Sequence, residues 1–178
     1  MEAREGKMKS RKLSSIFVGF LLAVLSCAPL AAQSQNPVGL GVSLGLADAT
    51  GSTPNIPNTS GSLSFNWGFY VDIPLLYTFH ITPSAELYKL QDQNATDVDL
   101  TFKFIVPLSG FAIYAGVVPG LTAVTDVLDP HIGVLAGATF QLVSNLDLFF
   151  QGKYNIVFDS GQNLQVIHLN AGILFKFN

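Results

Sequence analysis

A strict two-residue alternation of apolar and polar side chains limits the folds that this sequence can adopt. In segment 62–79, apolar residues at every second position from Leu63 to Ile73 alternate with Ser, Asn, Gly, Tyr and Asp. Segments 97–107 and 164–177 show the same pattern, and helical periodicity is hard to find between Gln33 and Asn178. Successive side chains of a β-strand point to opposite faces, so this period predicts strands with one apolar and one polar face. The chain is therefore predicted to be all-β.

The turn-forming residues divide the chain into eight predicted strands. These strands cover roughly residues 37–47, 62–79, 84–91, 97–107, 111–120, 130–142, 146–157 and 164–177. Tight reversals are predicted at 80–83, 107–110 and 143–145, where Pro, Gly, Ser and Asn favour turns. Longer polar links are predicted at 48–61, 92–96, 121–129 and 159–163. Such alternation of short and long links is typical of a transmembrane barrel.

The first 32 residues have the organisation of a secretory signal. Five basic residues lie within positions 4–12, an apolar stretch covers 16–25, and small residues cover 28–32. We expect this signal to direct export and to be cleaved after Ala32. The remaining domain, residues 33–178, is then expected to form a barrel in the outer membrane of a bacterium. Met8 is an alternative start. Cys27, in the sequence Val-Leu-Ser-Cys, resembles the lipobox of bacterial lipoproteins, so an acylated N-terminus at Cys27 is an alternative to one at Gln33.

The charge of segment 33–178 excludes several classes of function. This segment has four lysines and no arginine against ten acidic residues, a net charge of about −6. Binding of nucleic acid depends on clustered Lys and Arg, so a nucleic-acid partner is not expected. The segment also lacks cysteine, which excludes disulfides, thiol catalysis and cysteine-ligated metals.

The polar faces of the predicted strands favour a barrel in lipid over one in water. A soluble barrel points its apolar face inward, whereas a membrane barrel points it outward around a polar lumen. Small residues that suit a tight lumen are Gly39, Gly41, Ser43, Gly45, Gly133, Gly137 and Thr139. Aromatic residues near strand ends, as in interfacial girdles, are Trp67, Tyr77, Phe79, Phe111, Phe140, Tyr154, Phe175 and Phe177. We therefore predict an eight-stranded antiparallel up-and-down transmembrane β-barrel.

The last predicted strand resembles the C-terminal assembly signal of outer-membrane proteins. The motif places Asn170 two residues before Gly172 and ends on Phe175 and Phe177, although Asn178 follows where such proteins usually stop on the aromatic residue. Over about 140 residues the layout resembles the small outer-membrane barrels of the OmpW, OmpX and OmpA-transmembrane type. The resemblance implies insertion by the barrel assembly machinery and, variously, structural, adhesive or small-solute roles.

The lumen is the candidate site, because unpaired charges are costly there and should pair with one another. The charged residues expected to satisfy one another there are Asp72, Lys103, Asp147, Lys153 and Lys176. The predicted polar cluster consists of Lys103, Tyr114, Glu86, Asp99, Asp147, Lys153, His168 and Lys176. A two-residue hairpin centred between Leu108 and Ser109 would place Tyr114 opposite Lys103, with Glu86 within diagonal reach.

Three functions are compatible with this sequence. The favoured one is a non-enzymatic barrel in envelope structure or surface contact, with outer-membrane lipid as its surroundings and segment 48–61 as a possible site for a surface ligand. A narrow conduit is the second, because glycines of the first and sixth strands could leave a gap in the lumen; a wide porin needs more strands. A lipid-modifying enzyme is the third, but His80, His131 and His168 have no evident serine partner. No catalytic residue, cofactor or metal site is predicted.

Overall fold

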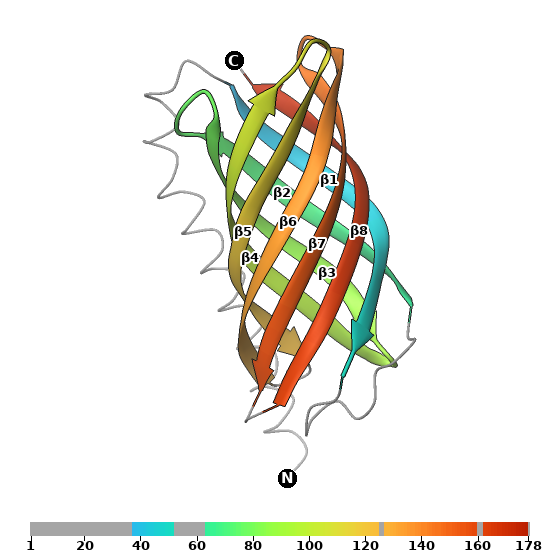
Figure 1. Ribbon diagram of the computed structural model, residues 1–178. Helices are drawn as coiled ribbons and strands as arrows, with labels where there is room; N and C mark the ends of the chain where they lie inside the picture. Colours follow the sequence, from blue (N-terminus) through green and yellow to red (C-terminus); the bar gives the residue numbers. More distant parts are fainter. Residues whose placement is uncertain (1–36, 52–62, 125–126, 160–161, 178) are drawn as a thin grey trace, which may run out of the picture.

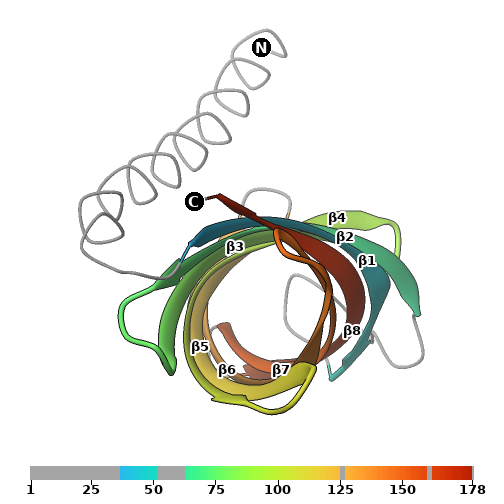
Figure 2. The same cartoon turned by 90° about the horizontal axis from the view of Figure 1, so that it is seen from above.

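A computed structural model shows an eight-stranded antiparallel barrel (Figure 1) and describes residues 37–51, 63–124, 127–159 and 162–177. The strands are β1 (Val38–Thr50), β2 (Ser64–Pro74), β3 (Phe79–Leu90), β4 (Gln93–Pro107), β5 (Phe111–Val124), β6 (Val127–Val143), β7 (Leu146–Asp159) and β8 (Gln162–Phe177). Each strand pairs with its neighbours in sequence, and β1 closes the barrel by pairing with β8 from Val38↔Phe177 to Thr50↔Gln165. Figure 2 shows the closed ring of strands from one end. The predicted all-β, up-and-down barrel is confirmed.

The predicted signal at 1–32 and most of segment 48–61 lie outside the residues that the structure describes. Within the described ranges, no helix is long and apolar enough to cross a membrane.

The connections at the end of the barrel that carries Phe177 are all short, and we call this the short-turn end. They are residues 75–78, 108–110 and 144–145. The first differs from the predicted reversal at 80–83, which was wrong. The amide nitrogens of Leu75 and Leu76 both donate to the carbonyl oxygen of Phe79 at 3.0 Å, so the chain has already reversed before Pro83. Pro83 lies within β3. The β2–β3 ladder is interrupted at Pro83 and continues on either side of it, because proline has no N–H to donate.

The connections at the opposite end, the long-loop end, are shorter than predicted. Segments 92–96 and 121–129 were predicted as polar links, but the ladders run through Leu90↔Gln93 and Val124↔Val127. Thr122 and Asp129, which suggested a loop, face each other in the β5–β6 ladder, and Thr122 points into the barrel. Thirteen residues separate β1 from β2, whereas two residues separate β3 from β4, β5 from β6 and β7 from β8.

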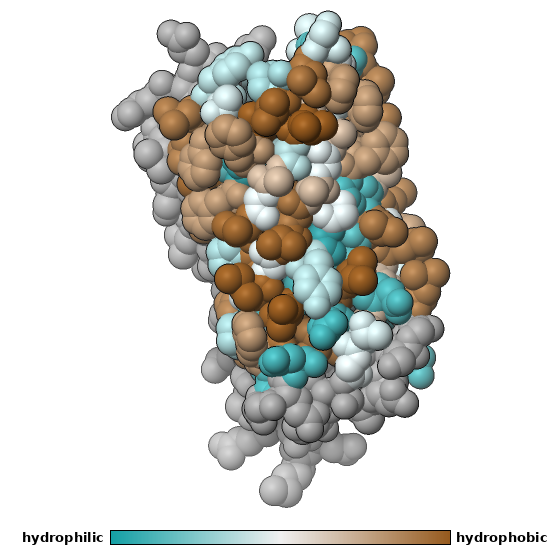
Figure 3. All heavy atoms as spheres, in the orientation of Figure 1, coloured by the Kyte–Doolittle hydropathy of each residue, from teal (hydrophilic) through white to brown (hydrophobic). Residues whose placement is uncertain are grey.

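Apolar side chains cover the outside of the barrel. On β1, Leu40, Val42, Leu44 and Leu46 are 43–60 % exposed, while the glycines and serine between them face inward. The space-filling view shows apolar side chains over much of the wall (Figure 3). This is the reverse of a water-soluble barrel, in which the outward face is polar.

A cluster of apolar side chains fills the interior at the long-loop end. Its members are Ala47, Ala49, Tyr88, Leu90, Ala95, Val124, Val157, Leu164 and Val166, all at most 4 % exposed. The polar part of the lumen therefore lies between this apolar cluster and the short-turn end.

Candidate functional site

Asp72 organises the polar interior at the short-turn end. Its carboxylate pairs with Lys103 Nζ at 2.6 Å and with His80 Nδ1 at 2.7 Å, and it accepts a hydrogen bond from Thr82 Oγ1 at 2.7 Å. The side chains come from β2, β3 and β4 and meet because neighbouring strands place their inward residues side by side. A second ion pair at this end joins Lys176 Nζ to Asp147 Oδ2 at 2.7 Å.

Tyr70 is the hub of the middle level. Its hydroxyl donates to Glu86 Oε1 at 2.8 Å and lies 3.1–3.3 Å from donors on Ser43, Gln151 and Asn170. These partners come from β1, β3, β7 and β8, so the Tyr70 hydroxyl links strands on opposite sides of the lumen.

Lys153 supplies the positive charge of the middle level. Its Nζ lies 2.7 Å from Asp99, 3.2 Å from Glu86 and 3.6 Å from Asp97, and the residue is only 2 % exposed. A buried ammonium needs such negatively charged neighbours, because its transfer from water into the protein costs on the order of several kcal/mol.

Asp97 is the most extensively hydrogen-bonded carboxylate of the next level towards the long-loop end. It accepts hydrogen bonds from Tyr88, Thr122 and Asn155 at 2.8–3.0 Å. His168 Nε2 lies 3.4 Å from Asp97 Oδ2, and the His168 ring meets the Tyr88 ring edge-on at 4.9 Å. Four strands therefore converge on one carboxylate inside the barrel.

All eight residues of the predicted polar cluster point into the barrel, but the predicted contacts among Lys103, Tyr114 and Glu86 were partly wrong. Lys103 faces Gly116, and Tyr114 faces Ile105. The hairpin is centred between Ser109 and Gly110: Leu108 N donates to Phe111 O at 2.8 Å, and Gly110 adopts a φ of 86°. Glycine tolerates this φ, and the one-residue shift of the turn moves every facing pair by two positions.

The predicted pairing of Lys103 with Glu86 is also corrected. Glu86 faces Asp97, six residues along β4 from Lys103, which is a separation of roughly 20 Å at the usual rise of a strand. Glu86 pairs with Lys153, and Lys103 pairs with Asp72. Lys103 and Tyr114 are nevertheless close, as predicted, but through a cation–π contact: Lys103 Nζ lies 5.1 Å from the centroid of the Tyr114 ring.

The predicted cluster also missed several interior residues, chiefly Tyr70, Asp97, Thr122 and His131. They lie in the polar phase of the same two-residue alternation that identified Lys103. That signal was available for Tyr70 and Asp97, whereas Thr122 and His131 fell in a predicted loop or at its edge.

The lumen glycines do not leave the predicted gap. A Cβ on Gly137 would lie 2.5 Å from the hydroxyl oxygen of Tyr114, and one on Gly45 would overlap the Asn170 amide. The missing side chains thus make room for large side chains that cross the lumen. Two interior cavities, one beside Asp72 and one beside Lys153, have volumes of about 20 and 10 Å³, which is space for about one or two water molecules.

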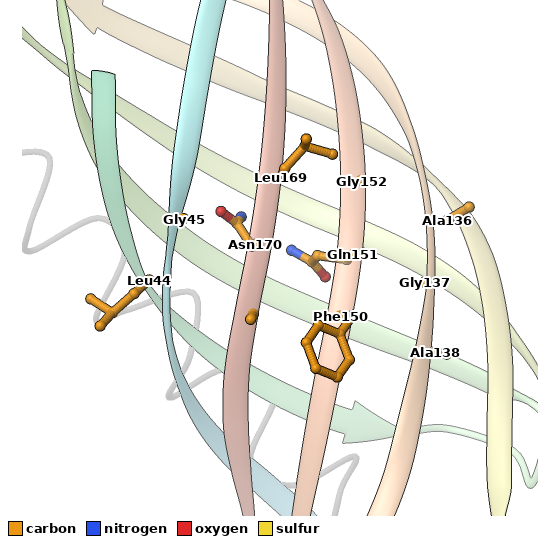
Figure 4. Close-up of a pocket in the computed structure, with 11 residues that line it drawn as sticks. Leu44, Gly45, Ala136, Gly137, Ala138, Phe150, Gln151, Gly152, Leu169 and Asn170 are labelled. Atoms are coloured by element: carbon orange, nitrogen blue, oxygen red, sulfur yellow. The ribbon is translucent and has the colours of Figure 1, made fainter. Parts of the chain in front are cut away.

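A shallow groove of about 620 Å³ lies on the outer wall over β1, β6, β7 and β8 (Figure 4). Its floor is formed by the small outward residues Ala136, Ala138, Gly152 and Ala171, and bulkier apolar residues flank it. The groove therefore belongs mainly to the apolar outer surface, although the inward-facing Gln151 and Asn170 also line it.

The predicted assembly motif is divided between the two faces of β8. Asn170 and Gly172 point inward, where Asn170 Nδ2 donates to the Tyr70 hydroxyl and Gly172 lies beneath the Phe149 ring. Phe175 and Phe177 point outward, with their rings edge-on at 4.8 Å. Both halves have structural contacts of their own, and recognition by the assembly machinery stays a prediction.

One histidine does have a hydroxyl partner that the sequence did not reveal. Thr122 Oγ1 lies 2.8 Å from His131 Nδ1, and His131 Nε2 lies 2.8 Å from Asp99 Oδ1. A hydroxyl nucleophile needs access to its substrate. Thr122 is 1 % exposed, and the apolar cluster covers it on the side of the long-loop end. A substrate therefore has no open path to the Thr122 hydroxyl.

Comparison with known proteins relates the fold to one structural class. No family model matches the sequence, and no curated protein matches it. The crystal structure of Neisserial surface protein A matches with a TM-score of 0.67 at 17 % identity, over 79 % of this chain and 97 % of that one. This chain has the fold of the small outer-membrane β-barrels. The N-terminal β-barrel domain of Pseudomonas aeruginosa OprF matches with a TM-score of 0.51 at 10 % identity, over 80 % of this chain and all of that one. At these identities the likeness concerns the outer-membrane barrel fold alone.

Proposed function

We propose that this chain is a non-enzymatic integral outer-membrane protein that acts in envelope structure or surface contact. The observation that carries the proposal is an apolar outer wall around a filled, polar interior. Large apolar side chains are exposed on every strand except β3, as Leu44 at 60 %, Phe69 at 46 % and Val134 at 56 % illustrate. Soluble monomers rarely expose an apolar surface of this extent, whereas lipid requires one.

Aromatic pairs near the short-turn end support a position at a membrane interface. Phe111 stacks on Phe140 at 5.8 Å, and Phe79 stacks on Phe102 at 6.5 Å. Aromatic rings are enriched at the level of lipid headgroups. Together with the Phe175–Phe177 pair, they form a partial girdle at one end of the wall.

The filled interior favours a role for the outside of the barrel. Ion pairs and hydrogen bonds occupy the lumen at successive levels, and the apolar cluster covers them at the long-loop end. No specific observation therefore favours the conduit. The rim at the long-loop end, including the segment at 48–61, is the part through which we propose that a surface ligand is contacted.

The first test asks whether the chain is a membrane barrel at all. Outer membranes of an expressing bacterium should contain the protein in a form that migrates faster on gels before boiling than after it. N-terminal sequencing of the same sample should give Gln33, and a start at an acylated Cys27 would establish the lipoprotein form. Recovery of the protein only in the soluble periplasmic fraction would contradict the proposal.

The second test separates envelope structure from surface contact. A deletion strain is complemented with the native chain or with a variant whose residues 52–61 are replaced by a short Gly-Ser link. Restored detergent resistance with both chains would assign a structural role, whereas loss of cell attachment to a surface with the variant alone would assign contact. If neither property depends on the gene, both roles are refuted.

A further inference from the structure

Three buried side chains place potential metal ligands close together inside the barrel. Asp97 and Asp99 of β4 and His131 of β6 each offer one ligand atom, and these atoms lie within 4.8 Å of one another. The three residues are 0–4 % exposed. Asp97 and Asp99 are two residues apart on β4, and His131 follows them by 32 residues or more in the sequence. The closed barrel therefore brings the three side chains together.

Two of these atoms are buried and have no polar partner other than each other. His131 Nε2 and Asp99 Oδ1 lie 2.8 Å apart, and neither makes a hydrogen bond to any other residue that the structure describes. Both atoms converge over Gly120, where a Cβ would lie 2.5 Å from His131 Nε2 and 2.7 Å from Asp99 Oδ1. Two atoms that bind one tetrahedral metal ion at about 2.1 Å each lie roughly 3.4 Å apart. The two side chains would therefore separate by roughly half an ångström to admit an ion between them.

Thr122 fixes the orientation of the histidine ring. Its hydroxyl has a single proton, which it donates to Asp97 Oδ1 at 2.8 Å. The 2.8 Å contact between Thr122 Oγ1 and His131 Nδ1 therefore needs the ring proton on Nδ1. Nε2 then points towards the Asp99 carboxylate, and either a second ring proton or a metal ion has to lie between the nitrogen and the oxygen. Metal-binding histidines are commonly held in this way by a hydrogen bond from the other nitrogen.

The charge of the cluster also calls for a cation. Glu86, Asp97 and Asp99 surround a single ammonium, that of Lys153, within 2.7–3.6 Å. With neutral histidines, the cluster lacks two positive charges, and one divalent ion supplies both. A set of one imidazole nitrogen and two carboxylate oxygens suits Zn²⁺ among the first-row metals.

We propose that Asp97, Asp99 and His131 bind one divalent transition-metal ion inside the barrel, with Zn²⁺ the best suited. The ion links β4 to β6 and neutralises the buried carboxylates. The apolar cluster covers the site from the long-loop end, so the ion enters while the barrel is closing. This site goes beyond the sequence prediction, which contained no metal site because the strand register that joins β4 to β6 through β5 was not known.

The test uses the full chain, without a histidine tag, refolded in detergent with Zn²⁺ or with EDTA. After gel filtration, the zinc-refolded sample should retain about one Zn²⁺ per chain. Its temperature of heat modification should rise by about 5–10 °C over the EDTA sample, for ion at roughly 100 times its Kd. Equal temperatures and no retained zinc would overturn the proposal.

Variants locate the site. Asp99→Asn and His131→Gln should lose both the retained zinc and the temperature shift. The matched control is His80→Gln, which removes a histidine that lies 2.7 Å from the carboxylate of Asp72 at the short-turn end and should keep both. A shift that persists in all three variants would refute these ligands. Should a variant fail to fold, Co²⁺ in the unaltered chain decides: intense visible d–d bands of four-coordinate cobalt support the site, and their absence refutes it.

Discussion

Replacement of Lys153 by methionine should destabilise this barrel strongly, because one ammonium holds three buried carboxylates together. Its Nζ lies 2.7 Å from Asp99, 3.2 Å from Glu86 and 3.6 Å from Asp97. Methionine keeps most of the volume and removes the charge. Breaking a buried ion pair by removing one partner costs about 3–5 kcal/mol, and we expect a loss in this range in the free energy of unfolding.

Lys103→Met is the matched comparison within the same lumen. The side chain of Lys103 is 12 % exposed, and its partner Asp72 keeps contacts from His80 and Thr82 after the change. The expected loss is therefore smaller, about 1–3 kcal/mol, as for a buried polar group that loses one of several partners. The difference between the two lysines tests the arrangement of levels described above.

The assay is urea unfolding in lipid vesicles, followed by tryptophan fluorescence and by gel migration, with EDTA present so that no metal ion compensates for the missing ammonium. Adding Asp99→Asn to Lys153→Met should recover part of the loss, at least about 1 kcal/mol, because contacting residues are coupled. A loss below about 1 kcal/mol for Lys153→Met, or equal losses for the two lysines, would refute the reasoning.

Two further predictions concern β8 and the outer wall. Gly172→Ala should cost about 1–3 kcal/mol by overpacking, because its Cβ would lie 2.5 Å from the Phe149 ring, and urea unfolding of the refolded variant measures this loss. The control Gly152→Ala should be nearly neutral, since its Cβ meets only a leucine methyl group at 3.6 Å; equal losses would contradict the packing argument. Leu44→Lys should reduce stability in vesicles by about 2–4 kcal/mol if this wall faces lipid, whereas Leu63→Lys near the long-loop rim should cost only about 0–1 kcal/mol. A neutral Leu44→Lys would instead indicate that water surrounds the barrel.

The division of the assembly motif between two faces of β8 bears on how such a motif is tested. Asn170 and Gly172 pack inside against Tyr70 and Phe149, while Phe175 and Phe177 lie outside. A substitution in the inner half alters stability as well as any recognition. Substitution of the outer phenylalanines is therefore the cleaner probe of recognition by the assembly machinery.

The number of strands, their antiparallel order and the inward face of each strand could all be predicted from the amino-acid sequence. These features follow from local properties: the two-residue period of a strand and the residues that favour turns. Lys103 could be placed in the lumen because Phe102 and Phe104 occupy the other phase of the same strand. Turns were harder to predict where residues that favour turns also occur in strands. The turn at Pro83 and the loop at 121–129 were predicted wrongly for that reason.

Which inward residues contact one another depends on the strand registers of the folded barrel. Moving the centre of the 108–110 turn by one residue, to the position that the positive φ of Gly110 allows, put Lys103 opposite Gly116 and Tyr114 opposite Ile105. Contacts such as Lys153 with Asp99 join residues 54 positions apart across the lumen, and they depend on the registers of all the intervening ladders. Each register follows from its turn geometry and the fit of facing side chains, so small local differences accumulate into a different set of partners.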